Sequence, residues 1–366
     1  MSKDLRKRAE EMAGTHNVIA CPGCGAFHDP ATFNSTKPVV CANCNTDLFA
    51  TPEEVAKQRL SETELASRLT SLNQKANKEK VICITCFVIM VIAIMFESLL
   101  LGIPSVIATL VFGFKQASTS HEAKVLLANN ITRDIMSEVF DESIYAAGYR
   151  LPDKTLREAK VIFNWDTATG SDLVQAKYKG HNISFSDVEL SEKVESEDNN
   201  GNTTTSYITK FKGQWLVCDL DREVPARLRL CENAERSGKV GKKLLGERIE
   251  VKGDVRTENE EFNKRFRILT DDDHSAFYIL TPHFMEFIIN ADNSANARTY
   301  LSFLENRVHI LSDTGKDSFE LQKNDGVNLE QIRRRMRSEL KYITSILDEL
   351  LRNEYLFGST DEEGIS

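Results

Sequence analysis

One apolar stretch, Val81 to Phe114, constrains this chain more than any other feature of its sequence. It reads VICITCFVIMVIAIMFESLLLGIPSVIATLVFGF, 34 residues with a single charge, Glu97, near the middle. A helix needs about 20 apolar residues to cross the ~30 Å core of a bilayer, so the stretch is long for one crossing and short for two. Glu97 and Ser98 divide it into two arms of 16 residues. We therefore expect a two-helix transmembrane hairpin over 81–114, with this pair at its turn.

Positive charge borders the stretch on both sides, which favours a cytoplasmic position for both flanks. Arms of ~24 Å fit a locally thinned bilayer, with flanking lysines extended to its surface. One alternative is a single transmembrane span over Val81–Leu101, which places the C-terminal part of the chain outside the cell's cytoplasm. A further alternative is a soluble protein in which this stretch forms a buried helix pair. The first 20 residues contain no apolar segment that would indicate a cleavable signal peptide. The basic flanking residues are Arg68, Lys75, Lys78, Lys80, Lys115, Lys124 and Arg133.

The length of the chain, 366 residues, and the distribution of its charges indicate several further segments. We expect a zinc ribbon over 1–50, a juxtamembrane helix and linker over 51–80, the hairpin, a cytosolic α+β domain over 115–356 and a disordered acidic tail over 357–366. The formal charge of the chain is -9, and acidic groups of the C-terminal domain account for it, because residues 1–50 are neutral. This balance argues against nucleic acid as a partner.

Four cysteines in two pairs predict a metal site near the N-terminus. Cys21 and Cys24, then Cys41 and Cys44, have the spacing of a four-cysteine zinc centre. Four thiolates close the coordination shell, so the zinc is expected to be structural, and they require a reducing compartment. His28 lies between the pairs and is interpreted as a loop side chain.

The C-terminal domain combines strand and helix patterns, which predicts an α+β class: an antiparallel sheet flanked by helices. A helix is expected from 118 to about 149 and a short one around 153–163. An apolar seam over 328–355 predicts a helix that lies on the sheet or forms a coiled coil, and Arg333 to Arg337 at its start form a solvated face or a lipid contact. Strands are expected at 172–178, 182–190, 205–212, 214–220, 247–252, 266–269, 276–280, 300–304 and 308–311, with a turn at 212–213.

Three blocks of this domain resemble a bacterial membrane-protein family catalogued only as a domain of unknown function. The blocks are GHNISFSDVELSE at 180–192, KFKGQWLVCDLD at 210–221 and EEFNKRFRILTDDDHSAFYILTPHFMEFI at 260–288. The resemblance covers about 81–325 and leaves the ribbon outside. It implies a bacterial inner-membrane location and supplies no catalytic residues.

No stretch carries a familiar catalytic motif. Asp271 to His274 could bind a divalent cation but are more typical of an exposed turn. His283 is interpreted as a surface or core residue rather than a general base, and Cys218 as an inert buried thiol. The sequence favours a non-enzymatic inner-membrane scaffold or adaptor, whose expected partners are the bilayer, another protein of unknown identity and, as a further option, a second copy of the chain. A membrane-bound enzyme with an unrecognised site in the C-terminal domain is the alternative, and alanine substitutions at 271–274 would distinguish the two.

Overall fold

The structure is a computed structural model that describes fourteen segments of the chain. They are residues 19–23, 27–28, 39–41, 46–51, 54–55, 59–96, 99–146, 148–197, 203–224, 227–232, 254–295, 297–318, 328–353 and 356.

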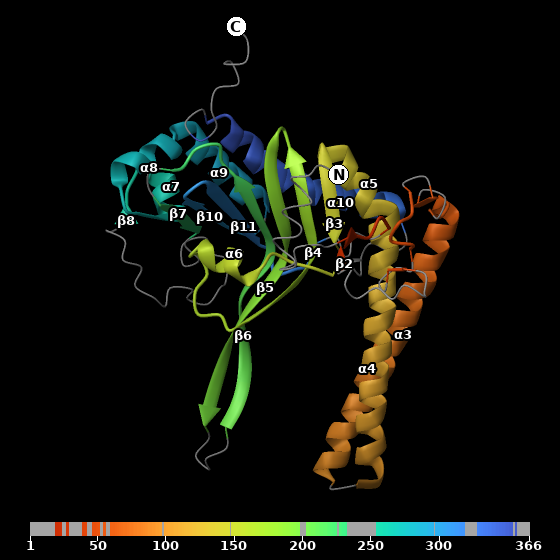
Figure 1. Cartoon of the computed structure of the whole chain (residues 1–366). Helices are drawn as coiled ribbons and strands as arrows, with labels where there is room; N and C mark the ends of the chain where they lie inside the picture. Colours follow the sequence, from red (N-terminus) through yellow and green to blue (C-terminus); the bar gives the residue numbers. More distant parts are fainter. Residues whose placement is uncertain are drawn as a thin grey trace.

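A nine-stranded sheet forms the body of the described chain (Figure 1). All its neighbouring strands that the structure describes are antiparallel, so the predicted α+β class with an antiparallel sheet is confirmed. β5 and β6 continue beyond their neighbours as a two-stranded arm. The spatial order is β3 (Glu142–Ala146), β4 (Thr167–Tyr178), β5 (His181–Glu197), β6 (Thr203–Asp219), β11 (Arg307–Asp313), β10 (Arg298–Leu304), β7 (Leu228–Glu232), β9 (Phe266–Thr270) and β8 (Asp254–Val255).

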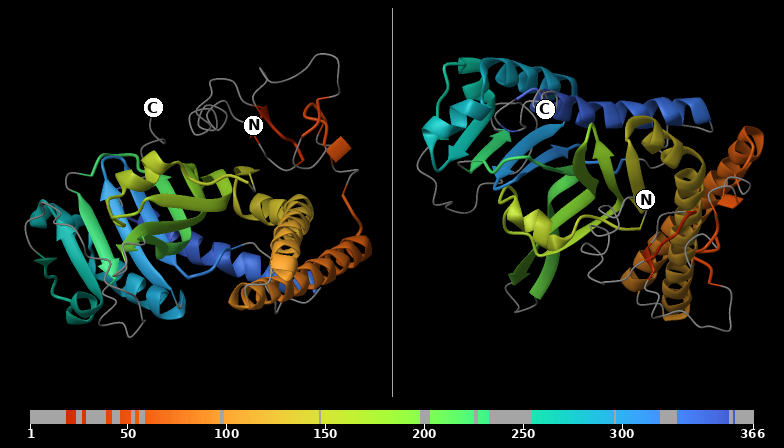
Figure 2. Two further views of the ribbon diagram at one scale, coloured as in Figure 1. Left: turned by 90° about the horizontal axis from the view of Figure 1, so that it is seen from below. Right: turned by 45° about the horizontal axis from the view of Figure 1, so that its top comes forward.

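Helices cover both faces of this sheet (Figure 2). The larger core lies under α5 (Arg133–Val139), α7 (Glu260–Arg265), α9 (Pro282–Ala295) and α10 (Leu329–Leu351). The apolar seam of α10 is buried in this core, so the helix lies on the sheet as one of the two predictions had it. The opposite face has a smaller core under α6 (Asp153–Glu158), centred on Trp165 and Trp215.

Two long helices form an antiparallel hairpin that projects from this body (Figure 1). α3 (Glu62–Met95) starts at the N-cap Ser61, whose hydroxyl accepts a hydrogen bond from the Glu64 amide. α4 (Leu99–Leu127) leads through a π-helical turn, η2 (Ala128–Thr132), into α5. Within the segment 51–80, expected to hold a juxtamembrane helix and linker, α3 is continuous from Glu62 onward. The predicted helix over 118–149 ends at Val139 and is followed by β3.

Two strand predictions in the C-terminal domain are also wrong. β6 is one strand through Lys212 and Gly213, where a turn was expected. A Cβ atom on Gly213 would lie 2.0 Å from the Ser312 carbonyl oxygen, so glycine allows close contact with β11 rather than a turn. The 276–280 segment belongs to α8 (Asp273–Ile279), which Asp272 caps by accepting from the His274 amide. The strand expected at 247–252 lies outside the described residues.

Candidate functional site

The hairpin carries a continuous surface of exposed apolar side chains, which we call the apolar band. Its members lie between residues 81 and 114 on both helices, with exposed fractions from 39% to 78%. Exposed patches of this size on soluble monomers mark contact with a membrane or another protein. The members are Val81, Ile82, Ile84, Phe87, Val88, Ile89, Val91, Ile92, Ile94, Met95, Phe96, Ile103, Val106, Ile107, Leu110, Val111 and Phe114.

Small and polar side chains fill the seam between the two helices. Gly102 faces Ala93, where an added Cβ would lie 3.9 Å from the alanine methyl group. The Cys83 thiol lies 3.7 Å from the Thr109 carbonyl oxygen across the seam. The buried Ser105 hydroxyl donates to the Gly102 carbonyl within α4 at 2.8 Å. The small side chains therefore face inward, as in helix pairs of membranes, while the large apolar side chains of the band are exposed.

Over the described residues, no helix combines the length and the apolar character that crossing a membrane requires.

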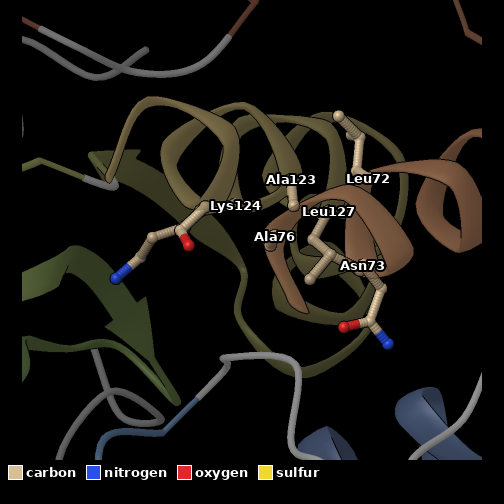
Figure 3. Close-up of a pocket in the computed structure, with 7 residues that line it drawn as sticks. Leu72, Asn73, Ala76, Ala123, Lys124 and Leu127 are labelled. Atoms are coloured by element: carbon tan, nitrogen blue, oxygen red, sulfur yellow. The ribbon is translucent and has the colours of Figure 1, made fainter. Parts of the chain in front are cut away.

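Polar contacts begin where the apolar band ends. Glu79 of α3 is buried, and its carboxylate accepts a hydrogen bond from the Thr119 hydroxyl of α4 at 2.8 Å. A cavity of about 160 Å³ lies between the helices at this end (Figure 3). Its lining residues are Leu72, Asn73, Ala76, Ser120, Ala123, Lys124 and Leu127.

Lys124 extends from this end of α4 toward the sheet (Figure 3). Its ammonium group lies 2.8 Å from Asp172 Oδ2 and 2.8 Å from the Ser171 hydroxyl, both in β4. Asp172 is fully buried and also accepts a hydrogen bond from the Tyr145 hydroxyl of β3. These contacts connect the hairpin to the sheet through a buried ion pair, here called the Lys124–Asp172 junction.

A β-bulge places Asp172 in this junction. The register of β4 against β5 shifts between Ser171 and Val174, and Asp172 has a left-handed φ of 62°. Asparagine and aspartate tolerate that conformation better than most residues, and bulges redirect side chains in this way. Gly170 precedes the bulge, and a Cβ on it would lie 2.1 Å from the Asp187 carbonyl oxygen.

A second buried carboxyl group, Asp187 of β5, lies beside the junction. Burial raises its pKa well above the usual value, and the negative charge of Asp172 raises it further. One of its oxygens accepts a hydrogen bond from the Ser318 amide. Burial also raises the pKa of Tyr145 well above its usual value, with Asp172 adding to the effect. Two ionised carboxylates in such close proximity are disfavoured, so the raised pKa of Asp187 favours its neutral form.

The structure describes half of the predicted zinc ligands. Cys21 and Cys41 are buried in one small cluster with Leu48, beside the short strands β1 (Ile19–Ala20) and β2 (Phe27–His28). The Gly23 amide donates to Cys21 Sγ at 3.3 Å, an arrangement that suits a thiolate. His28 Nε2 lies 3.2 Å from Cys41 Sγ, a closer approach than a loop side chain would suggest.

The other two predicted ligands, Cys24 and Cys44, lie outside the described residues. Within the described residues, no three His, Cys, Asp or Glu side chains are grouped so that they could hold a metal ion.

The other sequence candidates occupy structural positions. Asp271 accepts a hydrogen bond from the Arg227 amide at 2.8 Å, and Asp272 caps α8. His283 is exposed and lies 3.0 Å from Glu349, and Cys218 is buried within β6. Burial lowers the pKa of a histidine that the sequence did not single out, His309, to about 3, so its neutral ring accepts from Trp215 Nε1 at 3.2 Å.

The arginine cluster of α10 contacts acidic side chains. Arg333 pairs with Glu62 of α3, Arg337 lies 3.0 Å from Glu138 of α5, and Arg335 lies 2.8 Å from Glu339. These three arginines therefore hold α10 to neighbouring helices or to its own next turn. Glu97, the single charge of the apolar stretch, lies outside the described residues.

Sequence reasoning missed the junction entirely. From the sequence, Lys124 is one of several positive charges that flank the apolar stretch, and Asp172 and Asp187 fall within the expected strands 172–178 and 182–190. The one available signal is the Gly-Ser-Asp sequence at 170–172, a break in the apolar alternation of β4. It indicates a bulge but does not reveal which cation faces it.

Comparisons with known proteins concern the C-terminal part of the chain. The family model described as "Protein of unknown function (DUF3137)" matches residues 209–352, which supports a domain of unknown function there. No curated protein matches the chain. Among solved structures, the mycobacterial trehalose monomycolate transport factor A aligns at 12% identity over 58% of this chain and 94% of its own. Its TM-score of 0.30 is too low to indicate a shared fold.

Proposed function

We propose that the protein is a membrane-anchored scaffold whose hairpin inserts into the lipid bilayer and holds the sheet domain at the membrane surface. The apolar band carries this proposal, because its exposed side chains surround a helix pair whose seam is already filled. By contrast, the other described large apolar side chains that are exposed form no comparable surface, since they lie singly or, for Phe277 and Tyr278, as one adjacent pair: Val40, Phe49, Tyr149, Tyr207, Phe277 and Tyr278.

Lipid is the partner that fits an apolar surface on both helices. A docked protein would cover one side of the hairpin, whereas hydrocarbon covers all of it. Transfer of the band from water to hydrocarbon stabilises the inserted state by on the order of 10 kcal/mol. The apolar part of α3, from Val81 to Met95, is ~22 Å long at 1.5 Å per residue. An inserted hairpin of this length requires local thinning of the bilayer.

An inserted hairpin returns the chain to the side from which it entered. The N-terminal cysteines and the sheet domain then share one compartment, which we propose to be the cytoplasm of a bacterial cell, with the inner membrane as the location. Positive charge on both flanks supports this orientation.

We further propose that Cys21, Cys24, Cys41 and Cys44 hold a structural zinc ion. The joint burial of Cys21 and Cys41 and the amide hydrogen bond to Cys21 support this assignment. A bound zinc ion would cross-link the two cysteine pairs. Arg133 of α5 donates a hydrogen bond to the Pro22 carbonyl next to Cys21, so an ordered ribbon would present a fixed surface beside the sheet domain.

Extraction of the full-length chain tests the anchor. Cells that produce it are broken, and their membranes are washed with alkaline carbonate, which removes peripheral proteins and leaves inserted ones. The native chain is expected in the membrane pellet. The double variant Ile92→Lys, Ile107→Lys places a charge on each arm of the band and is expected in the supernatant.

The matched control is Tyr207→Lys, which changes an aromatic residue of the β5–β6 arm that is 60% exposed and lies outside the hairpin. It should remain in the pellet with the native chain. Release of the native chain by carbonate would refute the anchor.

A further inference from the structure

Four lysines are exposed at the border of the apolar band. Lys75, Lys78 and Lys80 lie on the last turns of α3 before the band, and Lys115 follows Phe114 on α4. Within the described part of the chain, none of the four forms an ion pair with a carboxylate. We call this set the lysine collar.

Contacts across the seam place two members of the collar, Lys80 and Lys115, at one level of the hairpin. Glu79 of α3 meets Thr119 of α4, and Cys83 meets Thr109. Lys80 and Lys115 lie between these two contacts, so they occupy the same height on neighbouring helices. The Lys115 ammonium lies 5.3 Å from the centre of the Phe112 ring, with its chain directed along the apolar surface.

The acidic group of this region is turned inward. Glu79 is the one carboxylate among residues 69–81 and 111–120, all of which the structure describes. It is 7% exposed and bonded to Thr119. At the level of Lys78, Lys80 and Lys115 the exposed charged groups are therefore all basic, and this surface continues directly into the apolar band; the nearest exposed carboxylate, Glu122 of α4, lies one turn beyond Thr119, near the level of Lys75.

We propose that the lysine collar binds the headgroups of anionic phospholipids. This inference rests on the proposed insertion of the hairpin. A ligand that satisfies both surfaces must carry a negative group joined to long apolar chains, and that is the chemistry of a phospholipid with an anionic headgroup. Nucleic acid and acidic peptides carry negative charge that suits the collar, but they lack the long apolar chains that would cover the band.

Other charged surfaces of the described chain fit this role less well. The lysines of the β5–β6 arm are neutralised within it: Lys193 lies 2.5 Å from Glu195, Lys210 lies 2.5 Å from Glu192, and Lys212 lies 2.8 Å from Glu189. Three arginines of α10 are paired as described above. The collar is thus the basic surface that lies nearest the band, and its charges are available to lipid headgroups.

Lipid selectivity in reconstituted membranes tests the proposal. The full-length chain is placed in phosphatidylcholine vesicles that contain a trace of spin-labelled phosphatidylglycerol or phosphatidylcholine, and electron paramagnetic resonance measures the fraction of each label immobilised by the protein. One lysine near a membrane surface contributes ~1 kcal/mol, or about fivefold in affinity. We expect the native chain to prefer phosphatidylglycerol about fivefold at low salt.

The variant with Lys75, Lys78, Lys80 and Lys115 changed to Gln should lose this preference, with a ratio near one. A control with Lys154, Lys264, Lys316 and Lys341 changed to Gln alters the net charge equally outside the hairpin and should keep it. Full selectivity in the collar variant would overturn the collar assignment alone. Failure of the native chain to incorporate, seen as an absence of immobilised label of either kind, would overturn the proposed function and the collar with it.

Discussion

The Lys124–Asp172 junction predicts a large and specific loss of stability when one partner is removed. At 2.8 Å, a unit charge pair interacts by about 6 kcal/mol at an effective dielectric constant of 20, before the cost of desolvation is subtracted. Removal of one partner from a buried pair costs about 3–5 kcal/mol, because the other charge is left buried. The Lys124 side chain is 17% exposed, and two hydroxyl groups still donate to Asp172, so we expect about 3 kcal/mol for Lys124→Met.

A double-mutant cycle separates the pair from its surroundings. In Asp172→Asn, the new asparagine also tolerates the left-handed backbone conformation, and the unpaired Lys124 can reach water. We therefore expect this variant to lose about 2 kcal/mol in the free energy of unfolding. The double variant should lose about 3 kcal/mol rather than the sum of 5, which gives a coupling of about 2 kcal/mol.

Thermal unfolding in detergent, followed by circular dichroism, measures these differences. For a domain of this size, 3 kcal/mol lowers Tm by about 6–12 °C. Lys154→Met serves as the control, because that lysine side chain is 89% exposed, and its Tm should change by less than about 2 °C. Additive losses in the double variant, or a Lys124→Met variant as stable as the native chain, would show that the Lys124–Asp172 pair does not stabilise the fold.

Three further predictions follow from other parts of the chain. Gly213→Ala brings a Cβ to 2.0 Å from the Ser312 carbonyl oxygen and should cost about 3 kcal/mol in denaturant unfolding. Asp187→Asn should remove a pH dependence of stability. Because the pKa of Asp187 is raised in the folded state, the free energy of unfolding of the native chain should fall as pH rises from about 4 toward that pKa, by up to ~1.4 kcal/mol per pH unit. The native chain should bind about one zinc ion, measured by mass spectrometry of the metal; Cys21→Ser should lose it, and His28→Gln should keep it.

Each of these predictions has a contradicting outcome. An unchanged unfolding midpoint for Gly213→Ala would mean that β6 and β11 separate without cost. Parallel stability curves for the native chain and Asp187→Asn between pH 5 and 8 would show that Asp187 is not held neutral. A native chain that binds no zinc would contradict the assignment of a zinc ribbon.

The sequence was most informative where one pattern dominated a segment. Alternating apolar residues correctly located the core parts of β4, β5, β10 and β11, and the apolar seam of α10 located its buried face. These segments bury one side against a single neighbour, so local periodicity carries the information.

The errors occurred where distant contacts decide the structure. Lys212-Gly213 has the composition of a turn, but the glycine is required by β11, a strand about 100 residues later in the sequence. Ala276 to Leu280 suits a strand or a helix equally well, and the Asp272 cap selects the helix. The Lys124–Asp172 junction depends on the bulge in β4 and on the direction of α4, neither of which local sequence specifies.

Topology of the hairpin is the most direct test of the membrane anchor. Single cysteines at position 98, at position 359 and near the N-terminus are treated, in intact cells and after permeabilisation, with a thiol reagent that does not cross membranes. For an inserted hairpin we expect labelling from outside at position 98 alone, with the other two sites reached after permeabilisation. Labelling of position 359 in intact cells would contradict it, because the sheet domain would then lie on the opposite side of the membrane from the N-terminal cysteines.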